Sequence, residues 1–156
     1  MILNGTFTFN GPRQRVWDLL QDPEVLAKAL PSTERLTLAG PDRYDGVMKV
    51  SVGPMTAAKF DVTVTLADKR PPEHFTMQID AKGALGFARG TATVGLQDQS
   101  EGGTLMQYSS DVQIGGRIAS VGQRLIESVS KMMMRQALEA LDGELRARIN
   151  ADASRS

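Results

Sequence analysis

Cysteine is absent from this sequence of 156 residues. No disulfide bond, thiolate metal site or cysteine nucleophile can therefore form within it. Histidine occurs once, as His74, which follows Pro71, Pro72 and Glu73 in what we expect to be an exposed turn. Transition-metal sites and many catalytic sites draw on these two residue types, so we predict no metal site and no catalytic residue.

Net charge is also absent, because 18 lysine and arginine residues balance 18 aspartate and glutamate residues. This balance argues against nucleic acid as a partner, since nucleic-acid binders are usually basic. No apolar run approaches the ~20 residues of a membrane-spanning helix. The first residues lack the basic start of a signal peptide, so we expect a cytoplasmic protein.

What the sequence does contain is a regular alternation of apolar and polar residues, which is typical of half-buried strands. A first strand is predicted over 2–10, and two short helices between Pro12 and Pro31, the second capped at Asp22 and Pro23. Further strands, separated by turn residues, are predicted over 34–40, 44–54, 59–69, 74–83, 87–99 and 104–116. Strands that follow one another through short turns form an antiparallel meander.

A C-terminal helix of about 30 residues is predicted from residue 115 onward, although it carries Gly122 and three consecutive methionines. One seam of this helix runs through Gly122, Ile126, Val129, Met133, Ala137 and Leu141. We expect Met133 to face the sheet, with Met132 and Met134 on its two flanks. The later leucines are expected either to close one end of a pocket or to contact a partner or membrane surface; they are Leu138, Leu141 and Leu145.

Only this helix is large enough to cover the apolar face of the meander, which predicts a curved antiparallel sheet wrapped around a helix. We expect a single ligand-binding domain over 1–149 and a disordered polar tail over 150–156. Small residues on the inner face would leave a cavity there, with Tyr108 as a polar contact for a carbonyl oxygen. The predicted lining residues are Leu26, Leu30, Val50, Phe60, Val62, Met77, Ala88, Tyr108, Leu125, Ile126, Val129 and Met133.

Four segments, in order and together reaching over roughly residues 1 to 145, resemble the CoxG family, which is named for a subunit of carbon monoxide dehydrogenase. They are NGTFTFNGPRQRVWDLLQDPEVLAKALPSTERL, VGPMTAAKFDVTVTLADKRPPEHF, GALGFARGTATVGL and VQIGGRIASVGQRLIESV. This family is part of the SRPBCC or START-like group of helix-grip domains. The resemblance implies an α+β fold in which a seven-stranded antiparallel curved sheet surrounds the long C-terminal helix, with two short helices after the first strand and a cavity for an apolar ligand.

Members of this family accompany molybdenum-flavin hydroxylases of the carbon monoxide dehydrogenase type, in membrane docking or in electron delivery to quinone. The resemblance therefore implies a non-enzymatic protein that binds a hydrophobic small molecule, a quinone or other lipid, and uses no cofactor. It implies hydroxylase subunits as partners and a peripheral contact at the inner face of the cytoplasmic membrane. Direct anchoring is not expected, because relatives often carry a membrane anchor in a C-terminal extension and this sequence ends soon after Ile149.

Two other interpretations stay open at this point. One is an enzyme of the polyketide cyclase or aromatase kind, which shares the fold and would need inward-pointing ionisable groups with shifted pKa values. The other is a protein-interaction adaptor that binds no ligand. The predicted inward positions, such as Val62, Val64, Val94 and Val112, are apolar, which favours a binding protein over an enzyme.

Overall fold

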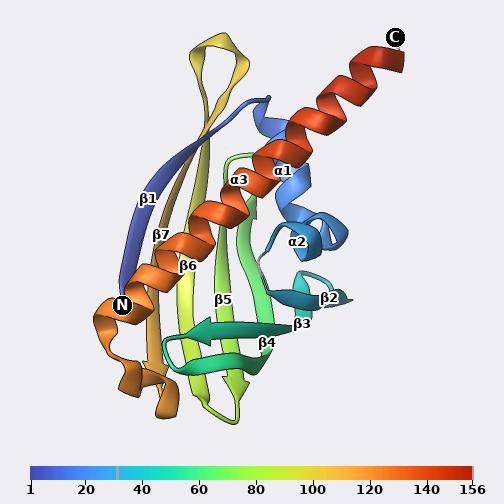
Figure 1. The fold of residues 1–156 in the computed structure, drawn as a ribbon. Coiled ribbons are helices and arrows are strands. Elements are labelled where there is room, and N and C mark those ends of the chain that lie inside the picture. Colours follow the sequence, from blue (N-terminus) through green and yellow to red (C-terminus); the bar gives the residue numbers. More distant parts are fainter. Residues whose placement is uncertain (31, 156) are drawn as a thin grey trace.

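The computed structural model describes residues 1–30 and 32–155. Strand β1 (Ile2–Phe9) leads into two short helices, α1 (Arg13–Gln21) and α2 (Pro23–Ala29). The elements that follow are β2 (Thr33–Gly40), β3 (Arg43–Val52), β4 (Met55–Arg70), β5 (His74–Gly83), β6 (Gly86–Asp98), the 3-10 turn η1 (Ser100–Gly102), β7 (Thr104–Gly115), the 3-10 turn η2 (Arg117–Val121) and α3 (Gln123–Arg155). Figure 1 shows α3 crossing the face of the sheet diagonally.

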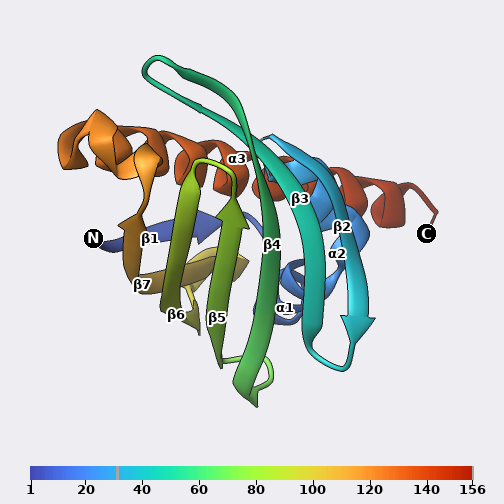
Figure 2. The same cartoon turned by 90° about the horizontal axis from the view of Figure 1, so that it is seen from below.

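The seven strands form one sheet in the order β1-β7-β6-β5-β4-β3-β2, and all neighbours are antiparallel. Strands β2 to β7 are a meander, and β1 closes the order by pairing with β7. The sheet curves around α3, as the second view shows (Figure 2). This architecture confirms the predicted α+β helix-grip fold, with its long C-terminal helix and its two short helices after the first strand.

The predicted alternation explains which side chains point inward. In β4, Phe60, Val62 and Leu66 are buried against α3 or the short helices, while Asp61 and Thr65 between them are exposed. One face of the sheet is therefore exposed to solvent and the other is covered by helices, as expected for an antiparallel sheet.

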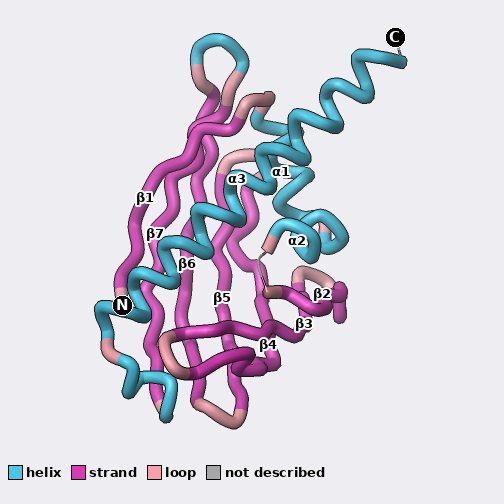
Figure 3. Tube along the Cα trace, viewed as in Figure 1, coloured by secondary structure: helices cyan, strands magenta, loops and turns pink. Residues whose placement is uncertain are grey.

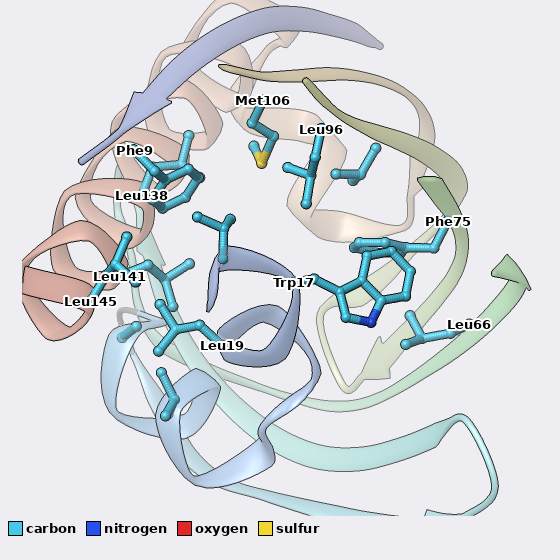
Figure 4. Packing of buried hydrophobic residues seen from close by; sticks show 14 of the residues in the cluster. Phe9, Trp17, Leu19, Leu66, Phe75, Leu96, Met106, Leu138, Leu141 and Leu145 are labelled. Atoms are coloured by element: carbon cyan, nitrogen blue, oxygen red, sulfur yellow. The ribbon is translucent and has the colours of Figure 1, made fainter. Parts of the chain in front are cut away.

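The two short helices fill the space between the sheet and the second half of α3. Trp17 of α1 contacts Phe75 of β5 edge to face, with ring centroids 5.4 Å apart (Figure 4). The side chain of Asp22 caps α2 by accepting the backbone N–H of Glu24 at 3.0 Å. The hydroxyl of Tyr44 donates to the carbonyl of Gln21 at 2.7 Å, which ties the end of α1 to β3. Pro31, predicted to end the second helix, lies outside the described residues.

The long helix differs from its prediction at both ends (Figure 3). Residues 117–121 form the separate turn η2, and Gly122 follows it with a φ of +101°, in the region that favours glycine. Gly122 is therefore not the first residue of the helical seam, and that prediction was wrong. At the other end, α3 continues through Arg155, so residues 150–155 are helical where a disordered tail was expected.

Candidate functional site

A cavity of about 170 Å³ lies between the first half of α3 and the sheet, open on one side. Strands β3 to β7 form one wall, and η2 and α3 form the other. The lining residues are Met48, Val50, Val52, Phe60, Val62, Ala81, Phe87, Ala88, Ile114, Ile118, Ile126, Val129, Ser130 and Met133. An almost wholly apolar lining with few polar groups is typical of a site for a hydrophobic small molecule.

The cavity exists because the side chains beneath the helix are small at one place. Ala81 of β5 and Ala88 of β6 lie directly opposite each other in the strand register, and both line the cavity. Each contributes only a methyl group, and α1 and α2 pack against the other half of α3. The backbone N–H of Ile118 donates to the carbonyl of Leu85 at 2.7 Å, which holds η2 against the β5–β6 turn at the edge of the site.

Seven of the predicted ligand-binding residues line this cavity: Val50, Phe60, Val62, Ala88, Ile126, Val129 and Met133. The other five do not. Leu26, Met77 and Tyr108 pack instead against the main core, and Leu30 caps the end of α2. Leu125 is 37% exposed on α3, close to the β3–β4 turn at Gly53. The prediction treated the space under α3 as one cavity, whereas α1 and α2 fill its other half.

Tyr108 lies away from the cavity for a local reason. It pairs with Gly5 in the β1–β7 ladder, and its ring lies over that glycine so closely that a Cβ there would collide with the hydroxyl. The ring borders a separate groove between β1 and α3, together with Phe7 and Met134. The predicted polar contact from Tyr108 is therefore not available to a molecule in the cavity.

Sequence reasoning missed seven lining residues: Met48, Val52, Ala81, Phe87, Ile114, Ile118 and Ser130. Strand periodicity could have found Met48, Val52 and Ile114, because each lies two residues from a predicted inward position, Val50 or Val112, and therefore on the same face of its strand. Ile118 comes from η2, which was expected to be part of the long helix. Ser130 lies four residues after Ile126 and therefore on the same face of α3.

The three methionines point in three directions. Met133 lines the cavity, Met134 packs against the main core, and Met132 is 42% exposed. The orientation predicted for the triplet is confirmed, and the triplet marks the place where α3 passes from the cavity to the main core. The later leucines are buried in that core rather than on a partner or membrane surface, with Leu138 6%, Leu141 3% and Leu145 1% exposed.

The titratable groups with shifted pKa values lie outside the cavity. Burial raises the pKa of Tyr44, and the charges of Asp42 and Asp22 raise it further. A hydrogen bond from Lys49 to Glu34, at 2.8 Å, lowers the pKa of Glu34 and raises that of Lys49. None of these side chains lines the cavity.

His74 begins β5, and its Nε2 lies 3.3 Å from a carboxylate oxygen of Asp68. Its side chain is 25% exposed, so it is less exposed than predicted. In the part of the chain that the structure describes, His, Asp and Glu side chains form no group of three or more that could hold a metal ion.

Comparison with known proteins identifies the family. The family model for CoxG, a subunit of carbon monoxide dehydrogenase, matches residues 5–146. The chain belongs to this family. None of the curated proteins compared matches this chain. Over residues 1–30 and 32–155, no helix combines the length and the apolar character that a membrane crossing requires.

Solved structures share the fold of this chain. A conserved protein from Geobacillus kaustophilus is 24% identical, with a TM-score of 0.89, over 94% of this chain and 96% of that one. A START superfamily protein from Mycobacterium smegmatis is 10% identical, with a TM-score of 0.72, over 94% and 97%. The Zhui aromatase/cyclase from Streptomyces sp. R1128 is 16% identical, with a TM-score of 0.70, over 96% and 95%. The likeness to these proteins establishes a START-like fold.

Proposed function

We propose that this CoxG-family protein binds the ring of a quinone-like lipid in the cavity under α3 and serves a molybdenum-flavin hydroxylase. The observation that carries the proposal is an apolar cavity of about 170 Å³, open on one side and lined by residues of both the sheet and the helix. An engineered apolar cavity of ~150 Å³ in another protein holds benzene. The volume therefore suits one substituted ring, and an isoprenoid tail would leave through the open side.

The partner enzyme is inferred from the family. The family is named for carbon monoxide dehydrogenase, which is the molybdenum-flavin hydroxylase that we propose as the partner. A protein that shelters a quinone ring in an apolar site can present that ring to such an enzyme, or take it away after reduction.

A peripheral contact with the cytoplasmic face of the membrane is also part of the proposal. The β3–β4 turn, the β5–β6 turn and η2 lie at one end of the molecule, near the start of α3 (Figure 1). Val52, Phe87 and Ile118, which adjoin these turns or belong to η2, line the cavity. Every charged side chain in 49–60, 81–89 and 115–126 is basic: Lys49, Lys59, Lys82, Arg89, Arg117 and Arg124. Lys49 pairs with Glu34, but Arg117 and Arg124 form no ion pair among the described residues. Basic side chains contribute about 1 kcal/mol each near an anionic lipid surface.

Catalysis is not part of the proposal, although one fold neighbour is an aromatase/cyclase. No Asp, Glu, His, Lys or Arg is among the residues that line the cavity. An acid–base catalyst must lie within hydrogen-bond reach of its substrate. A bound ring would meet apolar side chains and the hydroxyl of Ser130.

Calorimetric titration of the purified protein with duroquinone, a fully methylated single-ring quinone, tests the binding proposal. Ala88→Leu places a larger side chain in the cavity and should abolish binding while leaving the thermal midpoint unchanged or slightly raised. Ala140→Leu is the matched control, because Ala140 is exposed on α3, and it should bind duroquinone as the unaltered protein does. Equal binding by both variants would place the ring outside this cavity.

Sedimentation with vesicles tests the membrane contact separately. The protein should sediment with phosphatidylglycerol vesicles more than with phosphatidylcholine vesicles, and Arg117→Glu with Arg124→Glu should weaken this sedimentation. Arg146→Glu, on an exposed part of α3 at the other end of the molecule, is the control. Equal loss in both variants, or no preference for the anionic vesicles, would contradict the membrane contact.

A further inference from the structure

Among the described residues that line the cavity, Ser130 is the one with a polar side chain. It lies on the face of α3 that also carries Ile126, Val129 and Met133, and the strands opposite contribute only apolar side chains. Ser130 is half-buried, so its hydroxyl stays accessible from the cavity, and a guest that displaces solvent from it must offer a hydrogen-bond partner in return.

The hydroxyl of Ser130 has no such partner among the described residues. Serines within helices often satisfy themselves by donating to the carbonyl four residues earlier. Ser154, near the other end of α3, does so and donates to the carbonyl of Asn150 at 3.0 Å. The hydroxyl of Ser120 in η2 donates to the carbonyl of Arg117 at 2.6 Å. Ser130 differs from both, so its O–H donor is free for a molecule in the cavity.

We infer that Ser130 orients the guest by donating a hydrogen bond to a ring carbonyl oxygen, and that the site therefore selects a carbonyl-bearing ring over a hydrocarbon ring of the same shape. The inference rests on the proposed function and names the positioning residue of that site. It assigns to Ser130 the role that the sequence had suggested for Tyr108, which borders a different groove.

The apolar lining also limits the kind of group that Ser130 can bind. A neutral acceptor matches this environment, because a charged group would be desolvated without an opposite charge in the lining.

A matched pair of ligands tests the inference. Duroquinone and durene share one ring and four methyl groups, but only duroquinone carries carbonyl oxygens. The absence of cysteine excludes thiol addition to the quinone. The unaltered protein should bind duroquinone more tightly than durene, by about five- to tenfold, as expected for one net hydrogen bond.

Variants at one position assign the preference to the hydroxyl. Ser130→Ala should lose the preference by weakening duroquinone binding and leaving durene binding unchanged, and Ser130→Thr should retain it. Ser128→Ala, at an exposed serine of the same helix, should bind both ligands as the unaltered protein does.

Three results would overturn the inference in different ways. If the unaltered protein binds both ligands equally, Ser130 does not select the carbonyl. If Ser130→Ala lowers the affinity for both ligands by the same factor, the Ser130 side chain contributes only to the shape of the cavity and not to recognition of the carbonyl. If neither ligand binds the unaltered protein, the proposed function fails together with the inference.

Discussion

The two halves of α3 lie against the same sheet but meet different surroundings. The second half packs Leu138, Leu141 and Leu145 against β1 and the two short helices, in a core that contains Phe9 and Trp17. The first half packs Ile126 and Val129 around an open cavity, and the strands form its other wall with valine, alanine, phenylalanine, isoleucine and methionine side chains.

The difference lies in what fills the space between helix and sheet. At the second half, α1 and α2 enter this space and supply large side chains (Figure 4). At the first half, the alanine pair in β5 and β6 leaves the space empty. Stability is therefore concentrated at one end of the molecule, and the other end is free to take a guest. The predictions below test this division from the largest expected effect to the smallest.

A pair of truncations compares the two halves directly. Leu141→Ala should lower the free energy of unfolding by about 2–5 kcal/mol, because it opens a cavity in a filled core. Val129→Ala should cost about 1 kcal/mol, since its side chain already borders empty space. Urea denaturation measures both. Equal costs would mean that the cavity end contributes as much stability as the core end.

Asp142 holds the second half of α3 in place. Its two carboxylate oxygens accept the backbone N–H and the side-chain amide of Asn10, both at 2.8 Å, and the residue is 6% exposed. Asp142→Asn puts an amide group opposite the amide of Asn10 and should cost about 1.5–3 kcal/mol of unfolding free energy. Duroquinone binding at the other end should not change. The exposed partner Arg146, 3.4 Å away, is the control, because Arg146→Ala should change stability by less than about 0.5 kcal/mol.

Met133 and Met134 mark the boundary between the two halves. Met134→Ser should cost about 1–2 kcal/mol of unfolding free energy, because that side chain packs against the main core. Met133→Ala should cost less, about 0.5–1 kcal/mol, but it should change the affinity for duroquinone, since Met133 lines the cavity. Thermal melts and titrations of both variants separate the two effects. If Met134→Ser lost as much affinity for duroquinone as Met133→Ala, the boundary between the cavity and the main core would not lie between these two residues.

The bond between Tyr44 and Gln21 gives the smallest effect and a pH signature. Tyr44→Phe should cost about 0.5 kcal/mol of unfolding free energy at pH 8, because it removes a hydrogen bond to the carbonyl of Gln21. The folded protein raises the pKa of Tyr44, so this stabilisation is complete below the unfolded value of about 10 and is lost as pH rises through the folded value. The difference in unfolding free energy between the unaltered protein and Tyr44→Phe, measured by urea denaturation, should therefore decrease above pH 10. A difference in unfolding free energy that stays constant above pH 10 would contradict a stabilising role for the Tyr44 hydroxyl.

The fold could be predicted because its signals are local. Alternation in the strands, the cap at Asp22 and Pro23, and the long apolar stripe of α3 each follow from nearby residues. The exception is Gly122, where a helical pattern continues through a residue whose φ of +101° breaks the helix. Periodicity counts apolar positions and does not register a backbone turn of this kind.

The site was predicted only in part, because a cavity forms where no side chain fills the space between helix and sheet. Periodicity predicts which side chains of a strand or helix point inward, and on this basis Val62, Ile126 and Met133 were assigned to the cavity. Whether the space is filled depends on where α1 and α2 pack, which no local pattern states. Leu26 and Met77 were therefore assigned to the cavity although they lie in the core. Ser130 was passed over because a serine within an apolar stripe carries no periodic signal.

The alanine pair has a consequence for how such a protein changes over evolutionary time. Ala81 and Ala88 set the floor of the cavity from two neighbouring strands, while the main core lies at the other end of the molecule. Exchanging either alanine for a larger or smaller residue alters the shape offered to a guest and leaves the main core unchanged. Descendants of one ancestral sequence can therefore diverge in the molecule they carry through single substitutions, with the scaffold inherited intact.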